Sequence, residues 1–268
     1  MAKHGLILLL LLLLLCGCAA QVQTTGSDPD SGEPAKRALA LQRLALTPKN
    51  GGRLVDASLL EPGDIILSAG KGMVSVGIRV FTIAPVSHSV LYIGEGDIVE
   101  AVVGQGVRRR SLQESLDEDT VAVAFRAPDL TPEQGRQISA FAQAQVGTKY
   151  NALGVLLQAP FSIEKRICEL PILPTNVRDF CIRGVASIQL GVVSKKRFFC
   201  SQFLLEAYRS AGVPITDADP RWISPADLLH MREGDVPSMR VRQSLAYIGH
   251  LKFREPLTLD EMDAEEDL

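Results

Sequence analysis

Cys200 stands where an apolar stretch gives way to a helix-forming pattern. It follows Phe198 and Phe199 and opens an amphipathic run that extends to Tyr208. A helix N-terminus carries partial positive charge and unpaired N–H groups, which lower the pKa of a thiol below its usual value of about 8.5. The same groups could stabilise the oxyanion that forms when a thiolate attacks a carbonyl. Cys200 is therefore a candidate nucleophile, and the alternative is a buried structural cysteine.

A cysteine nucleophile needs a base, and His88 has the position best suited to one. It is the first residue of a predicted strand, where the backbone is rigid and the side chain reaches the edge of the core. His230 lies near a predicted helix end, where we expect a surface histidine stabilised by the helix dipole. His250 lies in the last predicted strand and is expected to be a core residue.

Glu100 is the candidate for an acid that orients this base. Two β-branched runs flank a glycine-rich turn after His88, which is typical of a hairpin. A turn centred on Gly94 would set His88 directly opposite Glu100, with Cβ atoms about 5 Å apart. Glu100 would then fix the tautomer of His88, as the third member of a triad does. A turn centred nearer Gly96 would remove this role from Glu100. The remaining candidates would then be Asp64 and Asp97.

The elements that must hold these residues are indicated by capping signals and β-branched runs. Strands are predicted after the turn of residues 60–64 and at 89–93, 98–102, 120–125 and 247–252. Helices are predicted at 74–81, from 131 to 147, at 198–211 and from 224. Because strands and helices are segregated rather than alternating, the α+β class is favoured over a parallel α/β fold.

The N-terminus has the pattern of a lipoprotein signal peptide. Lys3 precedes an almost pure leucine run that ends in Gly17-Cys18. The apolar run of about ten residues is too short to span a bilayer and has the length of a signal-peptide core. A small residue before a cysteine at this point resembles the lipobox, which implies cleavage after Gly17 and lipidation of Cys18. Because Ala19 is not the Asp associated with inner-membrane retention, we expect outer-membrane anchoring, facing the periplasm, in a cell with two membranes.

The whole chain divides into four parts. We predict a signal peptide at 1–17, a flexible membrane tether at 18–50, one folded domain at 51–254 and an acidic tail at 255–268. Residues 160–197 look like an insertion in that domain. The formal net charge of −3 does not suggest nucleic acid. The one basic run, Arg108-Arg109-Arg110, is expected to be a solvated turn.

Three further cysteines follow Cys18, which leaves an odd thiol in an exported chain. Cys168 and Cys181 flank a proline-bearing stretch with little periodicity. A disulfide between them would close that loop and leave Cys200 as the free thiol that an enzyme needs. The alternative is a pair of buried free cysteines.

The order of histidine, acid and cysteine is the reverse of that in papain. It resembles the circularly permuted NlpC-type papain-like enzymes, in particular the YaeF/YiiX-like group of amidase lipoproteins. The resemblance covers about residues 58–252 and implies an antiparallel sheet packed against helices, with Cys200 as nucleophile, His88 as base and Glu100 as orienting acid. Gln202 stands where this family has Glu. The segments that carry the resemblance are 60–67, 77–81, 86–90, 147–151, 199–203 and 222–228.

Three functions compete for this arrangement. The leading hypothesis is a cell-envelope thiol hydrolase or acyltransferase, with a peptidoglycan peptide amide as the expected substrate and lipid esters as the alternative. The second is a non-catalytic module that binds peptidoglycan or lipid through the same cleft. A metal site at His88 and Cys200 is disfavoured because the sequence has no CxxC or HxxxH spacing. No cofactor, metal, nucleic acid or obligate protein partner is expected, and the membrane is contacted through the lipid on Cys18.

Overall fold

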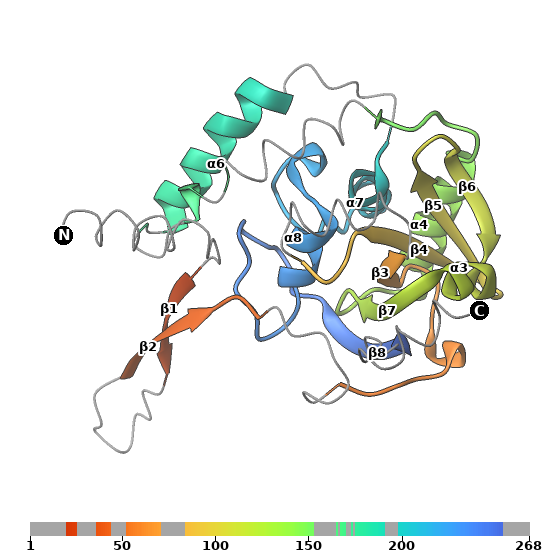
Figure 1. Cartoon of the computed structure of the whole chain (residues 1–268), viewed down its shortest axis with the longest axis horizontal. Helices are drawn as coiled ribbons and strands as arrows, with labels where there is room; N and C mark the ends of the chain where they lie inside the picture. Colours follow the sequence, from red (N-terminus) through yellow and green to blue (C-terminus); the bar gives the residue numbers. More distant parts are fainter. Residues whose placement is uncertain are drawn as a thin grey trace, which may run out of the picture.

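The computed structural model describes most of the predicted domain and a short N-terminal hairpin (Figure 1). The described residues are 20–25, 36–43, 52–70, 84–152, 165, 167–169, 173, 175–190 and 198–253. The predicted helix at 74–81, the predicted signal peptide and the predicted acidic tail lie outside them. No helix among these residues has both the length and the apolar character needed to cross a membrane.

The domain is built on a six-stranded sheet in which every neighbouring pair is antiparallel. The strand order is β6-β5-β4-β3-β7-β8. The structure confirms the strands predicted from β-branched runs. The bounds of the confirmed strands are β3 Ile65–Gly70, β4 His88–Gly94, β5 Asp97–Val102, β7 Asp119–Arg126 and β8 Ala246–Phe253. The sixth strand, β6 Gly106–Ser111, was not predicted.

The helices begin where the sequence offers capping residues. Thr131 and Ser224 form capping boxes at the starts of two predicted helices, and Ser111 does the same for a helix that the sequence analysis missed. The structure thus confirms the α+β class. The helix bounds are η2 Ala57–Leu59, α3 Leu112–Glu118, α4 Pro132–Ala144, α6 Thr175–Leu190, α7 Cys200–Ser210, η3 Pro220–Trp222 and α8 Pro225–His230.

The main core lies between one face of the sheet and helices α4 and α7 (Figure 1). Ile65, Leu91 and Phe125 from the strands are fully buried together with Ile138 of α4 and Phe203 of α7. A smaller cluster of apolar side chains covers the other face. Burial of this area is the main favourable term in folding, and it fixes α7 against β4.

Short segments cover part of each outer edge of the sheet. At β6, the N–H of Val107 donates to the carbonyl of Thr148 (2.8 Å), and the N–H of Gly147 donates back to Val107 (2.8 Å). A Cβ at Gly106 would lie 2.4 Å from the Thr148 carbonyl oxygen, so this close approach requires glycine. At β8, His250 exchanges backbone hydrogen bonds with residues 53 and 55.

The region predicted to be a flexible tether contains a hairpin. Strands β1 (Ala20–Thr25) and β2 (Lys36–Leu41) pair antiparallel, from Ala20 opposite Leu41 to Thr25 opposite Lys36. Polar composition favoured a tether, but residues 20–25 and 36–41 contain neither proline nor glycine, so every backbone N–H in both segments can donate a ladder hydrogen bond.

The predicted insertion contains a helix and a disulfide. A disulfide bond joins Cys168 to Cys181, and Lys165 forms a buried ion pair with Asp227 of α8. The sequence predicted little periodicity between the two cysteines. The stretch is nevertheless partly helical, because α6 begins at Thr175 and includes Cys181. The disulfide therefore ties the start of the insertion to the first half of α6.

We expect the double substitution Cys168→Ala/Cys181→Ala to lower the free energy of unfolding by about 3 kcal/mol. Without the disulfide, the loop between these residues, which are 13 apart, is no longer closed in the unfolded chain, whose entropy rises. Urea unfolding with and without dithiothreitol measures this difference. Reductant should lower the midpoint of the wild type and leave the double variant unchanged. Equal midpoints for both proteins without reductant would contradict the expectation.

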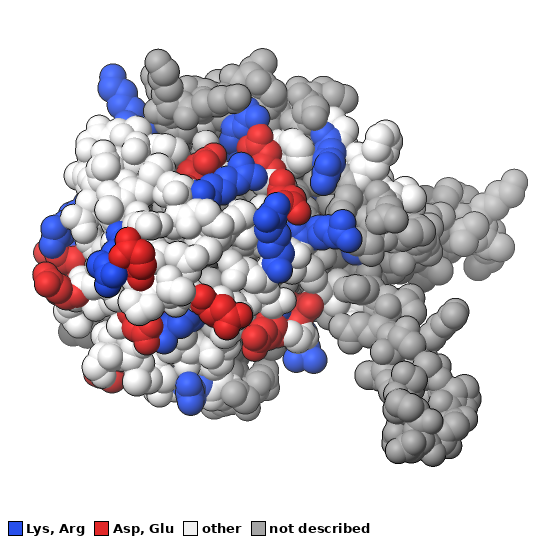
Figure 2. Space-filling view, turned by 180° about the vertical axis from the view of Figure 1, so that it is seen from behind, with Lys and Arg blue, Asp and Glu red and all other residues white. Residues whose placement is uncertain are grey.

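Charged side chains of both signs are interspersed on the face shown in Figure 2, and neither sign forms a continuous patch there. Among the described residues, several charged side chains are paired locally, such as Arg126 with Glu61 and Arg136 with Glu133. This face therefore lacks the basic stripe that nucleic-acid binding requires.

Candidate active site

Cys200 is the first residue of α7, as predicted, and it is a free cysteine that is buried. The N-cap residue, Phe199, makes no side-chain hydrogen bond to the helix. Helices α3, α4 and α8 all close their first turn with a capping box, so α7 differs from them in leaving its first N–H groups uncapped by a side chain. Uncapped N–H groups beside a thiol can hydrogen-bond a developing negative charge.

His88 and Glu100 are in contact, although not by the predicted pairing. The imidazole Nε2 lies 2.6 Å from Glu100 Oε2. The turn consists of Glu95 and Gly96, both with positive φ (56° and 79°), as a type I′ turn requires. This register places Val90, rather than His88, opposite Glu100. His88 is the diagonal neighbour on the same face, which a glutamate side chain can still reach.

Cys200 lies close enough to His88 for each group to shift the pKa of the other. Burial alone would lower the pKa of His88, but the hydrogen bonds to Cys200 and Glu100 outweigh it and raise that pKa to about 10. Burial would raise the pKa of the Cys200 thiol, and the hydrogen bond and charge of His88 more than offset this, so that the thiol pKa falls below its usual value. The pair therefore favours a thiolate beside an imidazolium.

Glu100 is fully buried and is held by two arginines as well as by His88. Its Oε1 lies 2.9 Å from Nε of Arg108 and 2.7 Å from Nε of Arg110. Burial opposes ionisation, but His88 and the two guanidinium groups hold the pKa of Glu100 at about 2. The carboxylate thus stays charged at neutral pH, with one oxygen on the arginines and the other on the imidazole.

The expectation that Arg108-Arg109-Arg110 is a solvated turn is wrong. The three arginines lie in β6, with Arg108 directly opposite Glu100 and Arg109 paired with Asp97 on the other face. The Gly104-Gln105-Gly106 sequence could have indicated a strand here, because two glycines so close together are typical of a tight turn between strands. Both glycines have positive φ at the connection from β5 to β6. Residues two apart on the resulting strand share a face, which is why Arg108 and Arg110 both reach Glu100.

The other acid and histidine candidates have different partners. Asp64 is buried against Arg126 (Oδ2 to Nη2, 2.7 Å), and Asp97 binds Arg109 (Oδ2 to Nε, 2.8 Å). His230 is the last residue of α8, but it is buried and contacts Asp235 (Nδ1 to Oδ2, 3.0 Å), so the expected surface position is wrong. His250 is buried, as expected, with its Nδ1 2.5 Å from the Tyr247 hydroxyl.

Asp119 is a buried carboxyl group beside this cluster that the sequence analysis missed. It is the first residue of β7, and burial raises its pKa to about 6, against the opposing charges of His88 and Arg110. Nothing in its local sequence distinguishes it from the neighbouring acids Asp117 and Glu118. Only the pairing of β7 in the sheet places it near the cluster.

The segment 147–151 connects the edge of the sheet to the approach of the nucleophile. Gly147 and Thr148 bond to β6, and three residues later the N–H of Asn151 donates to the carbonyl of Phe198 (2.9 Å). Tyr150 is half-buried. Burial raises the pKa of its phenol, and the charge of a thiolate at Cys200 raises it further. The segment 147–151 thus connects β6 to Phe198, two residues before Cys200.

Fold and site together define an α+β protein with a buried cysteine at a helix N-terminus, near a histidine that contacts a buried glutamate. The chain belongs to the family of the protein named "Probable lipoprotein peptidase YaeF" from Escherichia coli (strain K12). The two are 40% identical over 201 residues, which cover 74% of this chain and 73% of YaeF.

Two further comparisons complete this result. No model of a known protein family matches the chain. A crystal structure of the metalloprotein yiiX from Escherichia coli O157:H7 superposes with a TM-score of 0.43 and 17% identity, over 72% of this chain and 98% of that one. Among the described residues of this chain, no group of three or more His, Cys, Asp or Glu side chains is arranged to hold a metal ion.

Proposed function

We propose that this protein is a cell-envelope lipoprotein, anchored through Cys18, that cleaves an amide or ester bond by nucleophilic attack of Cys200. His88 is the general acid–base and Glu100 the acid that orients it. The observation that carries the proposal is the chain of contacts from a thiol at a helix N-terminus, through an imidazole, to a buried carboxylate. The peptidase name of YaeF supports a hydrolytic role.

In the first half of the reaction, the Cys200 thiolate attacks the carbonyl carbon and forms a C–S bond. The carbonyl electron pair moves to oxygen, where the uncapped N–H groups at the start of α7 can stabilise the negative charge. When the intermediate collapses, the bond to the leaving amine or alcohol breaks and the leaving group takes the proton of the His88 imidazolium. The product is a thioester on Cys200 and a neutral imidazole.

In the second half, water attacks the thioester and gives its proton to His88. Collapse of this second intermediate releases a carboxylic acid and restores the thiolate and the imidazolium. An acceptor alcohol or amine in place of water would give acyl transfer by the same steps. Glu100 acts through His88: it keeps Nε2 protonated, so that Nδ1 is left to face the sulfur.

The proposed substrate is a peptidoglycan peptide, cleaved at the face of the membrane that carries the lipid anchor. Outer-membrane anchoring facing the periplasm is part of this proposal and follows from Ala19. The test is to incubate the protein with muropeptides and with phospholipids side by side and to identify products by mass spectrometry. Cleavage of a peptide amide supports the proposal, and cleavage of a lipid ester alone would assign the site to lipids instead.

The pKa directions predict how Cys200 reacts with iodoacetamide. The alkylation rate should already be high at neutral pH, because the thiol pKa is lowered, and it should fall as the pH drops through that lowered pKa. In a His88→Ala variant burial dominates, so the same rate should be reached only at a pH above the usual thiol pKa of about 8.5. Mass spectrometry of the peptide that contains Cys200 measures both profiles. Identical profiles would favour a non-catalytic binding module.

A further inference from the structure

The N-terminal hairpin connects the segment that follows the proposed lipid anchor to the surface of the domain. Ala20, two residues after Cys18, pairs with Leu41 at the domain end of β2. The next two residues bind the domain: Gln42 Nε2 donates to Ser238 Oγ (3.0 Å), and the N–H of Arg43 donates to Asp235 Oδ1 (2.9 Å). We call the contacts of Gln42 and Arg43 the attachment point. Two residues span at most about 7 Å, which limits how far a lipid on Cys18 could be from Ala20.

Beside this attachment point, α6 presents an apolar outer face. Phe180 is 80% exposed and Val177, three residues earlier, is 48% exposed, so both lie on one side of the helix. The opposite side, with Arg178 and Ile182, is buried. Ile167, 55% exposed, precedes Cys168, whose disulfide partner Cys181 follows Phe180. We call Ile167, Val177 and Phe180 the outer apolar patch.

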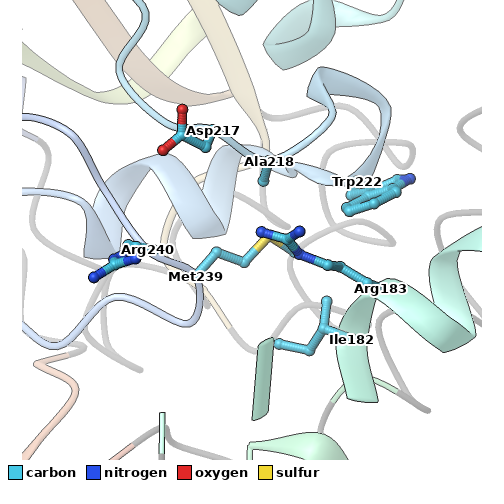
Figure 3. A pocket seen from close by; sticks show the side chains of 7 residues that line it. All are labelled: Ile182, Arg183, Asp217, Ala218, Trp222, Met239 and Arg240. Carbon is cyan, nitrogen blue, oxygen red and sulfur yellow. The ribbon is translucent and has the colours of Figure 1, made fainter. Parts of the chain in front are cut away.

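The attachment point and α6 border the same segment of the chain. Ser238 binds the hairpin through Gln42, and its neighbour Met239 lines a pocket together with Ile182 and Arg183 of α6 (Figure 3). The exposed Arg240 lies at the same pocket. Figure 1 shows β1 and α6 on the same side of the six-stranded sheet. Helix α6, which carries the outer apolar patch, and the two arginines thus border the segment that binds the hairpin.

We propose that the outer apolar patch rests on the bilayer to which Cys18 is attached, with Arg183 and Arg240 at the level of anionic headgroups. An apolar helix face flanked by basic side chains is typical of a segment that lies in the membrane interface. The attachment point lies two residues and one strand pairing from the proposed acyl anchor, which would keep α6 near the bilayer whenever the anchor is inserted. The inference rests on the lipidation of Cys18 in the proposed function and does not depend on the chemistry of Cys200.

A tryptophan at the patch tests this contact directly. The chain has one tryptophan, Trp222, so Phe180→Trp in a Trp222→Phe background gives a single reporter. The lipidated protein is placed in vesicles of phosphatidylethanolamine and phosphatidylglycerol with brominated acyl chains. We expect the Phe180→Trp emission to fall by about half or more, because interfacial side chains enter the bilayer by about 5–10 Å. Val146→Trp, just after α4 and 46% exposed, is the matched control and should keep its emission.

A second measurement removes the lipid. The mature chain with Cys18→Ala is sedimented with the same vesicles, unbrominated, with and without Val177→Ser/Phe180→Ser. The double variant should bind about tenfold more weakly, because serine removes the apolar area that the bilayer would bury. Leu59→Ser, at a site 50% exposed, should bind like the parent.

Equal quenching of the Phe180→Trp and Val146→Trp reporters, or equal binding of the two Cys18→Ala chains, would overturn the proposal. Formation of a dimer that disappears with Val177→Ser/Phe180→Ser, without quenching, would also overturn it and would assign the patch to a second copy of the chain. Both measurements work in a Cys200→Ala chain, so a failure of the proposed catalysis does not affect them.

Discussion

We expect Cys200→Ala to lower kcat/KM by at least about 10⁴-fold on whichever substrate the wild type cleaves. Without the sulfur there is no acyl-enzyme, and only the orienting and oxyanion-stabilising groups remain to assist direct attack by water. The fold should persist, because alanine is tolerated at the start of a helix and the thiol contributes no structural bond. The measurement is product formation by mass spectrometry, alongside thermal unfolding of both proteins.

Cys168→Ala/Cys181→Ala is the matched control for loss of sulfur. It should be less stable than the wild type and yet still turn over below its unfolding temperature, whereas Cys200→Ala should be stable and inactive. Residual activity of Cys200→Ala within about tenfold of the wild type would end the proposal of covalent catalysis. Activity lost in both variants, with folding intact in both, would assign a further role to the disulfide region.

Glu100→Gln should have the second largest effect, on turnover and on stability together. The amide cannot stabilise an imidazolium, and loss of the third member of a triad lowers kcat by up to about 10⁴-fold. It also leaves Arg108 and Arg110 beside a neutral side chain in a buried site. Removal of one partner from a buried ion pair costs about 3–5 kcal/mol. Turnover assays and urea unfolding measure the two effects separately.

The pH dependence of unfolding separates these effects from a general loss of packing. The folded pKa of Glu100 is about 2, below its ordinary value of 4.5. The stability that it contributes is therefore fully present above about pH 4.5 and is lost as the pH falls toward 2. Glu100→Gln should lack this acid-dependent part. Asp97→Asn is the control, because Asp97 lies on the same strand as Glu100 and is a partly exposed partner of Arg109. It should lower the free energy of unfolding by at most about 1 kcal/mol and leave turnover unchanged.

Local signals predicted most of the elements that position this cluster. The capping residues Thr131 and Ser224 and the glycines after each helix mark backbone geometry that needs no tertiary information. Cys200 at the start of α7 and His88 at the start of β4 could be placed for the same reason. These positions marked the two residues as candidates, and the family resemblance implied their roles as nucleophile and base.

The errors arose where long-range pairing decides the outcome. The contact of His88 with Glu100 was correctly expected, but the predicted register of the hairpin was wrong by one residue on each strand. Because the two shifts together amount to two residues, both side chains stay on the same face of the sheet. Arg108, Arg110 and Asp119 approach Glu100 and His88 only because β6 and β7 add to the sheet. His230 was placed at the surface because a helix end gives no information on what packs over it.

The covered edges of the six-stranded sheet limit how a peptide could be bound. At β6 the hydrogen-bonding positions around Val107 are taken by Gly147 and Thr148, and at β8 those around His250 are taken by residues 53 and 55. An extended peptide that joins a sheet as an extra strand needs a row of unpaired N–H and C=O groups. At these two places an extended peptide therefore could not join the sheet as an extra strand.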